Sequence, residues 1–204
     1  MIDFKGNVKE KRTRGKQKRQ ASSKSKFARY RIIESYWIRN PLAKIDIISL
    51  QGKIKYLVSE ASLSPREEET YKKLKSLITK ELDPPETLNV DLEAYILSEA
   101  KRLSRKYRRS LGKFDEKSWE KIYYYVTRDL AGYGKIDVLM RDPNIEDISC
   151  NGVNKPVYVW HRKYESLPTN IIFDNETEYD DFIIKLAHMS GKHISSARPM
   201  LDAM

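Results

Sequence analysis

Apolar residues of the kinds common in β-strands gather in two short segments, residues 43–50 and 53–59. Both are rich in Ile, Val and Tyr, and Gln51-Gly52 between them suits a two-residue turn. We therefore predict a β-hairpin. Before it, residues 34–38 lead to Asn40-Pro41. The proline disfavours a helix at Asn40 and marks the start of the segment that contains the hairpin.

An amphipathic helix is predicted after the hairpin. Ser64 as N-cap, Pro65 at the first helical position and Glu67 at the third form a capping box. The helix stops before residues 83–85, Asp-Pro-Pro. Its apolar residues recur every three or four positions, as in a helix with one buried face: Tyr71, Leu74, Leu77, Ile78 and Leu82.

Two further helices follow. The first covers about residues 89–109, and the second begins with Asp115 as N-cap. The second ends at residues 132–134, Gly-Tyr-Gly, which act as a helix stop or a hinge. Short connections favour antiparallel helices packed on the hairpin, with the Trp and Tyr stripe in the core rather than exposed for stacking on bases. The stripes are Leu92, Tyr95, Ile96, Leu103 and Tyr107, then Trp119, Ile122, Tyr123, Val126 and Leu130.

Short strands are predicted again after Asp142-Pro143, at residues 146–150, 156–160 and 169–173, with Asn151-Gly152 as a turn. Asn175 and Glu178 then cap a helix that extends to Ser190. The fold class is therefore α+β: a helical bundle with a β-hairpin, followed by a small sheet-and-helix sub-domain. We place the tail at 1–31, the hairpin plus helical sub-domain at 32–131, and the α+β sub-domain at 132–204.

Charge distinguishes the N-terminus from the rest. Of the 204 residues, 39 are Lys or Arg and 29 are Asp or Glu, and the whole excess of +10 lies in residues 1–31. Few apolar residues occur there, so we expect a tail that is disordered when free. Its candidate residues for membrane or partner binding are Lys5, Lys9, Lys11, Arg12, Arg14, Lys16, Lys18, Arg19, Lys24 and Lys26.

Basicity alone leaves four roles open for the tail: a solvated segment, or contact with an anionic membrane surface, with nucleic-acid phosphates or with an acidic protein face. Phe4 is the one aromatic residue among residues 1–26, so the tail has no stacking platform and specific nucleic-acid recognition is not expected. A second basic cluster, six Lys and Arg within residues 101–109, is either a solvated helix face or a docking patch.

No complete catalytic or metal site occurs in the sequence. His161, His188 and His193 lack the spacing of a helical metal-binding pair, and Cys150, in a predicted strand, is expected to be structural. None of the eight glycines belongs to the phosphate-binding pattern G-x-x-x-x-G-K-[ST]. The apolar runs are too short to span a bilayer, no secretory signal is recognisable, and one cysteine fits a reducing compartment, so we expect a cytoplasmic protein.

Two blocks of sequence resemble the N-terminal domain of the secretion ATPase superfamily, which drives type II secretion, type IV pili and archaella. One block spans residues 132–173; it opens with Gly-x-Gly-x-Ile-Asp-x-Leu and contains Asp142-Pro143-x-Ile145-Glu146-Asp147-Ile148, Asn151-Gly152 and Val157-Tyr158-Val159. The other begins with Glu34-x-Tyr36-Trp37 and extends to Glu67. It is similar to the archaeal branch, most of all to the archaellum motor ATPases, with pilus and secretion paralogues as close competitors.

The resemblance implies a domain that precedes a RecA-like ATPase domain in a hexameric ring and needs ATP and Mg²⁺ in the full-length protein. Such a motor couples ATP hydrolysis to archaellum or type IV pilus-like assembly and movement. Its implied partners are a polytopic membrane platform protein and accessory motor proteins, and its implied location is cytoplasmic, peripheral at the inner face of the cell membrane. A chain without the phosphate-binding loop is expected to be inactive alone.

The last residues carry the implied nucleotide contact. Residues 194–203 match the Arg-Pro-x-x-Asp-Ala stretch of the family, which makes Arg198 a candidate contact to ATP phosphates in the full-length protein, or else a plain surface arginine. A guanidinium suits the role because it is always charged and forks onto phosphate oxygens. The chain is expected to be truncated before the ATPase domain. Two alternatives stay open: a basic-tailed nucleic-acid-binding module, and a non-enzymatic adaptor with the same fold.

Overall fold

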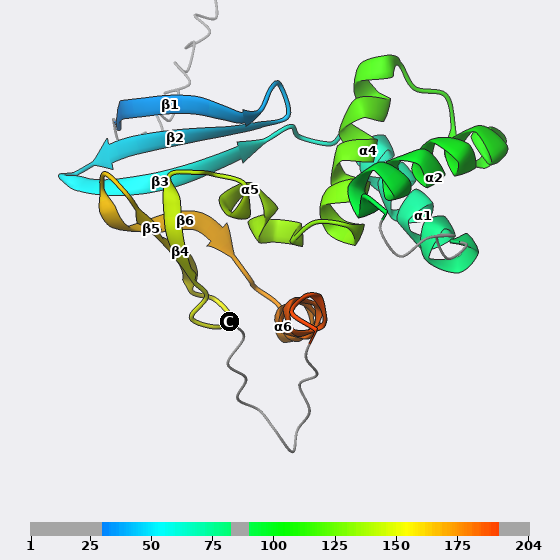
Figure 1. The fold of residues 1–204 in the computed structure, drawn as a ribbon. Coiled ribbons are helices and arrows are strands. Elements are labelled where there is room, and N and C mark those ends of the chain that lie inside the picture. Colours follow the sequence, from blue (N-terminus) through cyan, green and yellow to red (C-terminus); the bar gives the residue numbers. More distant parts are fainter. Residues whose placement is uncertain (1–29, 83–89, 192–204) are drawn as a thin grey trace, which may run out of the picture.

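A single six-stranded sheet organises the computed structural model, which describes residues 30–82 and 90–191 and shows the α+β class. Its strand order is β1-β2-β3-β6-β5-β4, and β3 and β6 pair in parallel where two antiparallel sets of three strands meet (Figure 1). The strands are β1 (Arg31–Arg39), β2 (Ala43–Leu50), β3 (Lys53–Glu60), β4 (Ile145–Ser149), β5 (Pro156–His161) and β6 (Glu165–Ile172).

The predicted hairpin is confirmed as β2 and β3. Gln51 and Gly52 at its turn have φ angles of 52° and 78°, the positive values that a two-residue turn between twisted strands requires. The apolar segment before it forms β1, which pairs with β2. Strand β6 begins four residues earlier than the predicted strand, because Leu167 faces the core together with Thr169 and Ile171.

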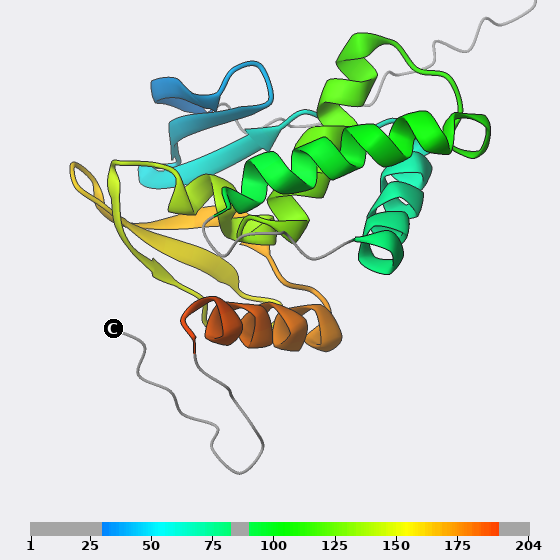
Figure 2. The same cartoon turned by 45° about the vertical axis from the view of Figure 1, so that its right-hand side comes forward.

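Three longer helices and one short one form a bundle beside the sheet (Figures 1 and 2). The capping box of Ser64 and Glu67 and the N-cap Asp115 are confirmed. The helix predicted over about residues 89–109 is present, but its first turn starts after Asp91, it breaks at Tyr107, and the short helix after the break ends with Gly112 as C-cap. The elements are α1 (Pro65–Glu81), α2 (Leu92–Lys106), α3 (Arg108–Leu111) and α4 (Glu116–Leu130).

The remaining helices belong to the sheet: η1 (Gly134–Ile136), α5 (Asp137–Met140) and α6 (Glu176–Met189), which Asn175 caps as predicted. They contribute Ile136, Val138 and Phe182 to the core that also contains the buried faces of β2, β3, β5 and β6. A separate core lies among α1, α2 and α4. The predicted packing of the bundle on the hairpin is therefore corrected: the bundle has its own core, and α4 joins the two cores through Tyr124.

The predicted sub-domain boundary between residues 131 and 132 falls directly after α4. Strands from both sides of it belong to the same sheet, so the division into two sub-domains stays a prediction. In the described part of the chain no helix is long and apolar enough to cross a bilayer. Residues 1–29, 83–89 and 192–204 lie outside the described residues. The ten candidate basic residues of the tail and Arg198 are among them.

Candidate functional site: a cleft between the sheet and the helices

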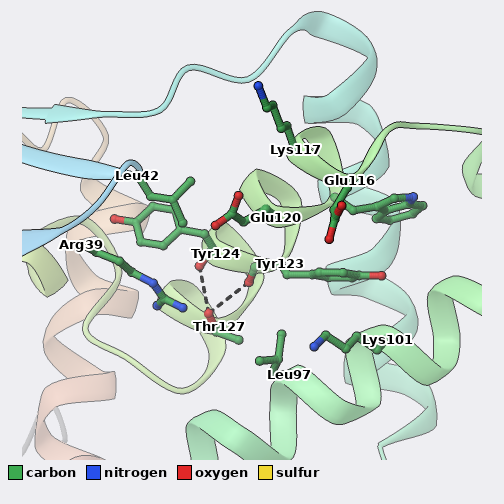
Figure 3. Close-up of a pocket in the computed structure, with 11 residues that line it drawn as sticks. Arg39, Leu42, Leu97, Lys101, Glu116, Lys117, Glu120, Tyr123, Tyr124 and Thr127 are labelled. Atoms are coloured by element: carbon green, nitrogen blue, oxygen red, sulfur yellow. Dashed lines mark hydrogen bonds between the residues drawn. The ribbon is translucent and has the colours of Figure 1, made fainter.

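A cleft of about 460 Å³ lies where the sheet meets the helical bundle (Figure 3). Its walls come from three separate stretches of sequence: the end of β1 and the turn after it, one face of α2, and one face of α4. The lining residues are Arg39 and Leu42, then Leu97 and Lys101, then Glu116, Lys117, Trp119, Glu120, Tyr123, Tyr124 and Thr127.

Helical periodicity explains why these residues share one cleft. Leu97 and Lys101 are four positions apart on α2, and Glu116, Glu120 and Tyr123 follow each other at four- and three-residue intervals on α4, so each set lies on one helix face. Both helices are fixed at their starts. The Asp91 carboxylate accepts from the backbone N–H groups of Glu93 and Ala94, and Asp115 accepts from that of Ser118.

The sheet side of the cleft is held by Arg39. Its guanidinium donates to Glu93 Oε1 at 3.0 Å and lies 5.5 Å from the centre of the Tyr124 ring. Tyr124 is buried, and its hydroxyl donates to Glu60. Burial, and then the negative charge of Glu60, raise the pKa of Tyr124 far above its usual value. The phenol therefore stays protonated, and this wall of the cleft offers shape rather than acid–base chemistry.

The opposite wall is an aromatic pair. Trp119 and Tyr123 stack with ring centroids 5.3 Å apart and planes 19° from parallel, while the edge of Phe114 meets Trp119 at 5.6 Å. The Tyr123 hydroxyl lies 2.6 Å from Ser104 Oγ. The helical spacing of Trp119 and Tyr123 predicted that both rings lie in the core. Ile122 is fully buried, but the two stacked rings are only half-buried and line both the cleft and a second hollow of about 240 Å³ beside α3.

The mouth of the cleft carries charge of both signs. Lys101, Lys117, Glu116 and Glu120 are exposed, and within residues 30–82 and 90–191 none of them forms an ion pair. Figure 3 shows Lys117 above the cleft and Lys101 below it. Apolar side chains in the lining, Leu42 and Leu97, together with unpaired cations and carboxylates at the mouth suit the binding of a polypeptide, because each charged side chain remains able to pair with an incoming group.

The buried acid Asp142, in the loop before β4, is structural. Asp142 is 4% exposed, and its Oδ2 accepts from the hydroxyls of Tyr36 and Tyr56, each at 2.6 Å. Its Oδ1 accepts from the backbone and side-chain amides of Asn144. With every lone-pair direction in use, this carboxylate holds β1 and β3 to the loop before β4 and is not available to a substrate.

His161 lies next to this network, and among the described residues no hydrogen bond joins it to Cys150. Nδ1 of His161 accepts from the backbone N–H of Lys163 at 3.1 Å, and burial lowers the pKa of its ring. Burial raises the pKa of the Cys150 thiol and so favours its less reactive protonated form. Within the described ranges, no group of three or more His, Cys, Asp or Glu residues is placed to hold a metal ion.

The predicted site residues and the observed cleft do not coincide. Arg198 and the ten basic candidates of the tail lie outside the described residues, although Arg31, the last residue of the predicted tail, begins β1. The basic cluster of residues 101–109 is divided between α2 and α3. Of that cluster, Lys101 reaches the cleft. The sequence did not predict the cleft, because its walls come from three distant segments. The only pattern that pointed to these walls was the periodicity of α2 and α4, and that periodicity predicted core packing.

Comparison with known proteins finds two long matches, both to uncharacterized proteins of Methanocaldococcus jannaschii. The chain is 43% identical over 150 residues to MJ1288, a match that covers 72% of this chain and 58% of that protein. It is 30% identical over 172 residues to MJ0900, covering 74% and 31%. No protein-family model matches the sequence. The chain is thus similar to regions of longer proteins from this archaeon, and spans less than two thirds of the length of each.

Proposed function

We propose that the chain is the N-terminal, partner-docking and moving domain of a hexameric motor ATPase, which couples ATP hydrolysis to the assembly and movement of an archaellum or type IV pilus-like filament. It acts in the cytoplasm, peripherally at the inner face of the cell membrane. Its partners are a polytopic membrane platform protein and accessory motor proteins. A RecA-like domain supplies the nucleotide chemistry.

The observation that supports this proposal is the place of the family-like motif in the fold. Gly132 leaves no room for a side chain, because an added Cβ would lie 2.2 Å from Asp137 Oδ1. The Asp137 carboxylate accepts from the backbone N–H of Tyr133 at 2.9 Å and from Arg141 Nε at 2.7 Å. These residues form the turn between α4 and the sheet. The opening Gly-x-Gly-x-Ile-Asp part of the resemblance thus lies at the joint that couples the bundle to the sheet, as a domain that moves as one body requires.

The described residues do not themselves fit ATP and Mg²⁺. They contain neither the phosphate-binding pattern nor a cluster of possible metal ligands, so no step involving the nucleotide is assigned to them. Arg198, the proposed phosphate contact, lies outside the described residues.

The test uses the native gene product at its native length. We expect Mg²⁺-dependent ATP hydrolysis and, by light scattering with ATP present, a mass of six subunits. Arg198→Ala should lower the rate by about tenfold or more, since an arginine at the transferred phosphate stabilises developing charge. The matched control is Arg162→Ala, an exposed arginine that pairs with exposed Glu146; it should leave the rate unchanged.

A native product that neither binds nor hydrolyses ATP would contradict the motor proposal and leave the non-enzymatic adaptor. Binding of DNA or RNA that falls steeply with salt, and that depends on the tail but not on the folded body, would instead favour the nucleic-acid-binding module.

A further inference from the structure

Six cations that follow one another along the bundle have no carboxylate partner within the described residues. We call them the cationic helix surface; they come from α2, α3, the following loop and the first turn of α4, and they are Lys101, Arg105, Arg108, Arg109, Lys113 and Lys117. All are exposed, and none forms an ion pair within the described parts of the chain. Their neighbours differ: Arg102 pairs with Glu99 at 2.7 Å and Lys106 with Glu81 at 2.8 Å.

The cationic helix surface is continuous with the cleft. Lys101 and Lys117 line the cleft, whereas Arg105, Arg108 and Lys113 line the smaller hollow beside α3. The stacked rings of Trp119 and Tyr123 form the wall between the two. An elongated ligand can therefore contact the cations along α2 and α3 and place one group in the cleft.

The chemistry of the surface selects among anionic ligands. A membrane surface is disfavoured because no large apolar side chain within residues 101–117 is exposed to anchor in it. A nucleic-acid strand is disfavoured because Trp119 and Tyr123 stack on each other rather than offering free faces.

An acidic polypeptide meets these requirements. Its spaced carboxylates match the guanidinium forks of Arg105 and Arg108, and an apolar side chain can enter the cleft that Leu42 and Leu97 help to line. We propose that the cationic helix surface and the adjoining cleft bind an acidic segment of a partner protein, with Asp and Glu side chains on α2 and α3 and one apolar anchor beside Leu97. This site is independent of the motor proposal.

A labelled twelve-residue peptide of Asp and Glu with one central Leu tests the site by fluorescence anisotropy on the full chain. The variant Lys101→Glu, Arg105→Glu, Arg108→Glu reverses three charges on the surface. The matched control is Lys53→Glu, Lys80→Glu, Lys155→Glu, which reverses three exposed charges elsewhere. Because the basic tail is present in both, its contribution is the same in each. We expect the surface variant to bind about tenfold or more weakly and the control to stay within about threefold of the unmodified chain.

An equal loss in the two variants would overturn the proposal, because it would assign the binding to net charge. Circular dichroism melting curves establish that each variant is folded. If the triple variant does not fold, the milder Arg105→Gln, Arg108→Gln variant replaces it, with Lys53→Gln, Lys80→Gln as its control.

The cleft is tested separately by coupling. Leu97→Gln in the chain and Leu→Ser in the peptide should each weaken binding about fivefold, and together should weaken it little further, because they remove the same contact. Effects that multiply would contradict insertion of the anchor. Twelve-nucleotide oligo(dT) and phosphatidylglycerol vesicles serve as competitors. If either binds more tightly than the peptide and loses binding in the surface variant, the acidic polypeptide is the wrong partner.

Discussion

The bundle has two charged faces that use their charges differently. On the face toward α6, Asp129 pairs with both Arg128 and Lys75, and Lys185 reaches this group from α6. On the cationic helix surface, which involves α2 and α3, six cations have no carboxylate partner within the described residues. The first face connects parts of the protein, whereas the second is free to bind something else.

The paired face is built around Arg128, whose side chain is 11% exposed. Its guanidinium donates to both Glu60 oxygens, at 3.0 and 2.8 Å, and Nε donates to Asp129 Oδ1 at 2.9 Å. Although burial opposes it, the charge of Arg128 keeps the pKa of Asp129 below its usual value. Lys185 Nζ donates to the backbone oxygens of Asp129 and Gly132, each at 2.6 Å, where the carbonyl end of α4 favours a cation.

Desolvation explains the difference between the two faces. A buried charge must be paired, because leaving it unpaired costs several kcal/mol. An exposed charge in water pays little for having no partner and gains little from one. Pairing on the α6 face is therefore a requirement of the fold, and the unpaired cations of the other face are retained at no comparable cost to stability.

The largest expected effect follows from removing Arg128. Arg128→Ala leaves Glu60 without its cation, and Asp129 with Lys75 alone, in a partly buried place, and should lower the free energy of unfolding by about 3–5 kcal/mol. Urea denaturation measures it. Arg105→Ala on the other face is the control and should change that free energy by less than about 0.5 kcal/mol. Similar losses in the two variants would contradict the distinction between the faces.

Acid should weaken a second buried ion pair, between α1 and α4. Glu67 is 3% exposed and lies 2.7 Å from Lys121 Nζ. Although burial opposes it, hydrogen bonds from Lys121 and the Ser64 backbone lower the pKa of Glu67 to about 2. Because this pKa is lower in the folded state, its stabilisation of about 3 kcal/mol is present above pH 5 and is lost as the pH falls toward 2.

The measurement is urea unfolding of the unmodified chain and of Glu67→Gln, at pH 6 and at pH 3. The stability difference between the two should be large at pH 6 and clearly smaller at pH 3. A difference that does not depend on pH would mean that the charge of Glu67 does not carry the stabilisation.

A smaller loss is expected at the joint beneath the paired face. In Gly132→Ala the new Cβ would lie 2.2 Å from Asp137 Oδ1 and 2.9 Å from the Arg128 backbone oxygen. Relieving this overlap should cost about 1–3 kcal/mol of the free energy of unfolding. The comparison is Gly134→Ala, which meets no atom within 4 Å and costs only about 1 kcal/mol for its φ of +59°. Thermal melts that rank the two variants in the opposite order would refute the close-contact explanation.

The smallest effect is expected on the cationic helix surface itself. Arg105→Gln with Arg108→Gln should change the free energy of unfolding by less than about 0.5 kcal/mol, because both side chains are exposed and unpaired within the described residues. Urea denaturation at low and high salt measures it. A loss above about 1 kcal/mol would show that these cations support the fold, and would weaken their assignment to a ligand.

Local chemistry made much of the fold predictable. Helix caps and tight turns act over four residues or fewer, so the sequence alone determined where they occur. They are the capping box of Ser64 and Glu67, the N-caps Asp115 and Asn175, and the turn at Gly52. The α+β class followed from them. Where a signal was weak, as at Tyr107, the predicted helix was too long.

The tertiary structure alone decided how the sheet closes. The side chain of Asn170 accepts from the backbone N–H of Val58 at 2.8 Å and donates to its carbonyl oxygen at 2.9 Å, across 112 residues of sequence. This contact sits beside the parallel pairing of β3 with β6. No local pattern encodes such a partner, because its free energy is gained only after the intervening helices have brought the strands together.

The same reason separates what was foreseen of the cleft from what was not. The helix faces that carry Lys101 and Tyr123, and the excess of positive charge in residues 101–109, could be predicted from the sequence alone. Only the packed structure set Arg39 and Leu42 against those faces. It also left the cations of the cationic helix surface without carboxylate partners among the described residues, while those facing α6 were paired. The sequence determines which residues are charged. Which of them form ion pairs is decided by burial and packing between segments that lie far apart along the chain.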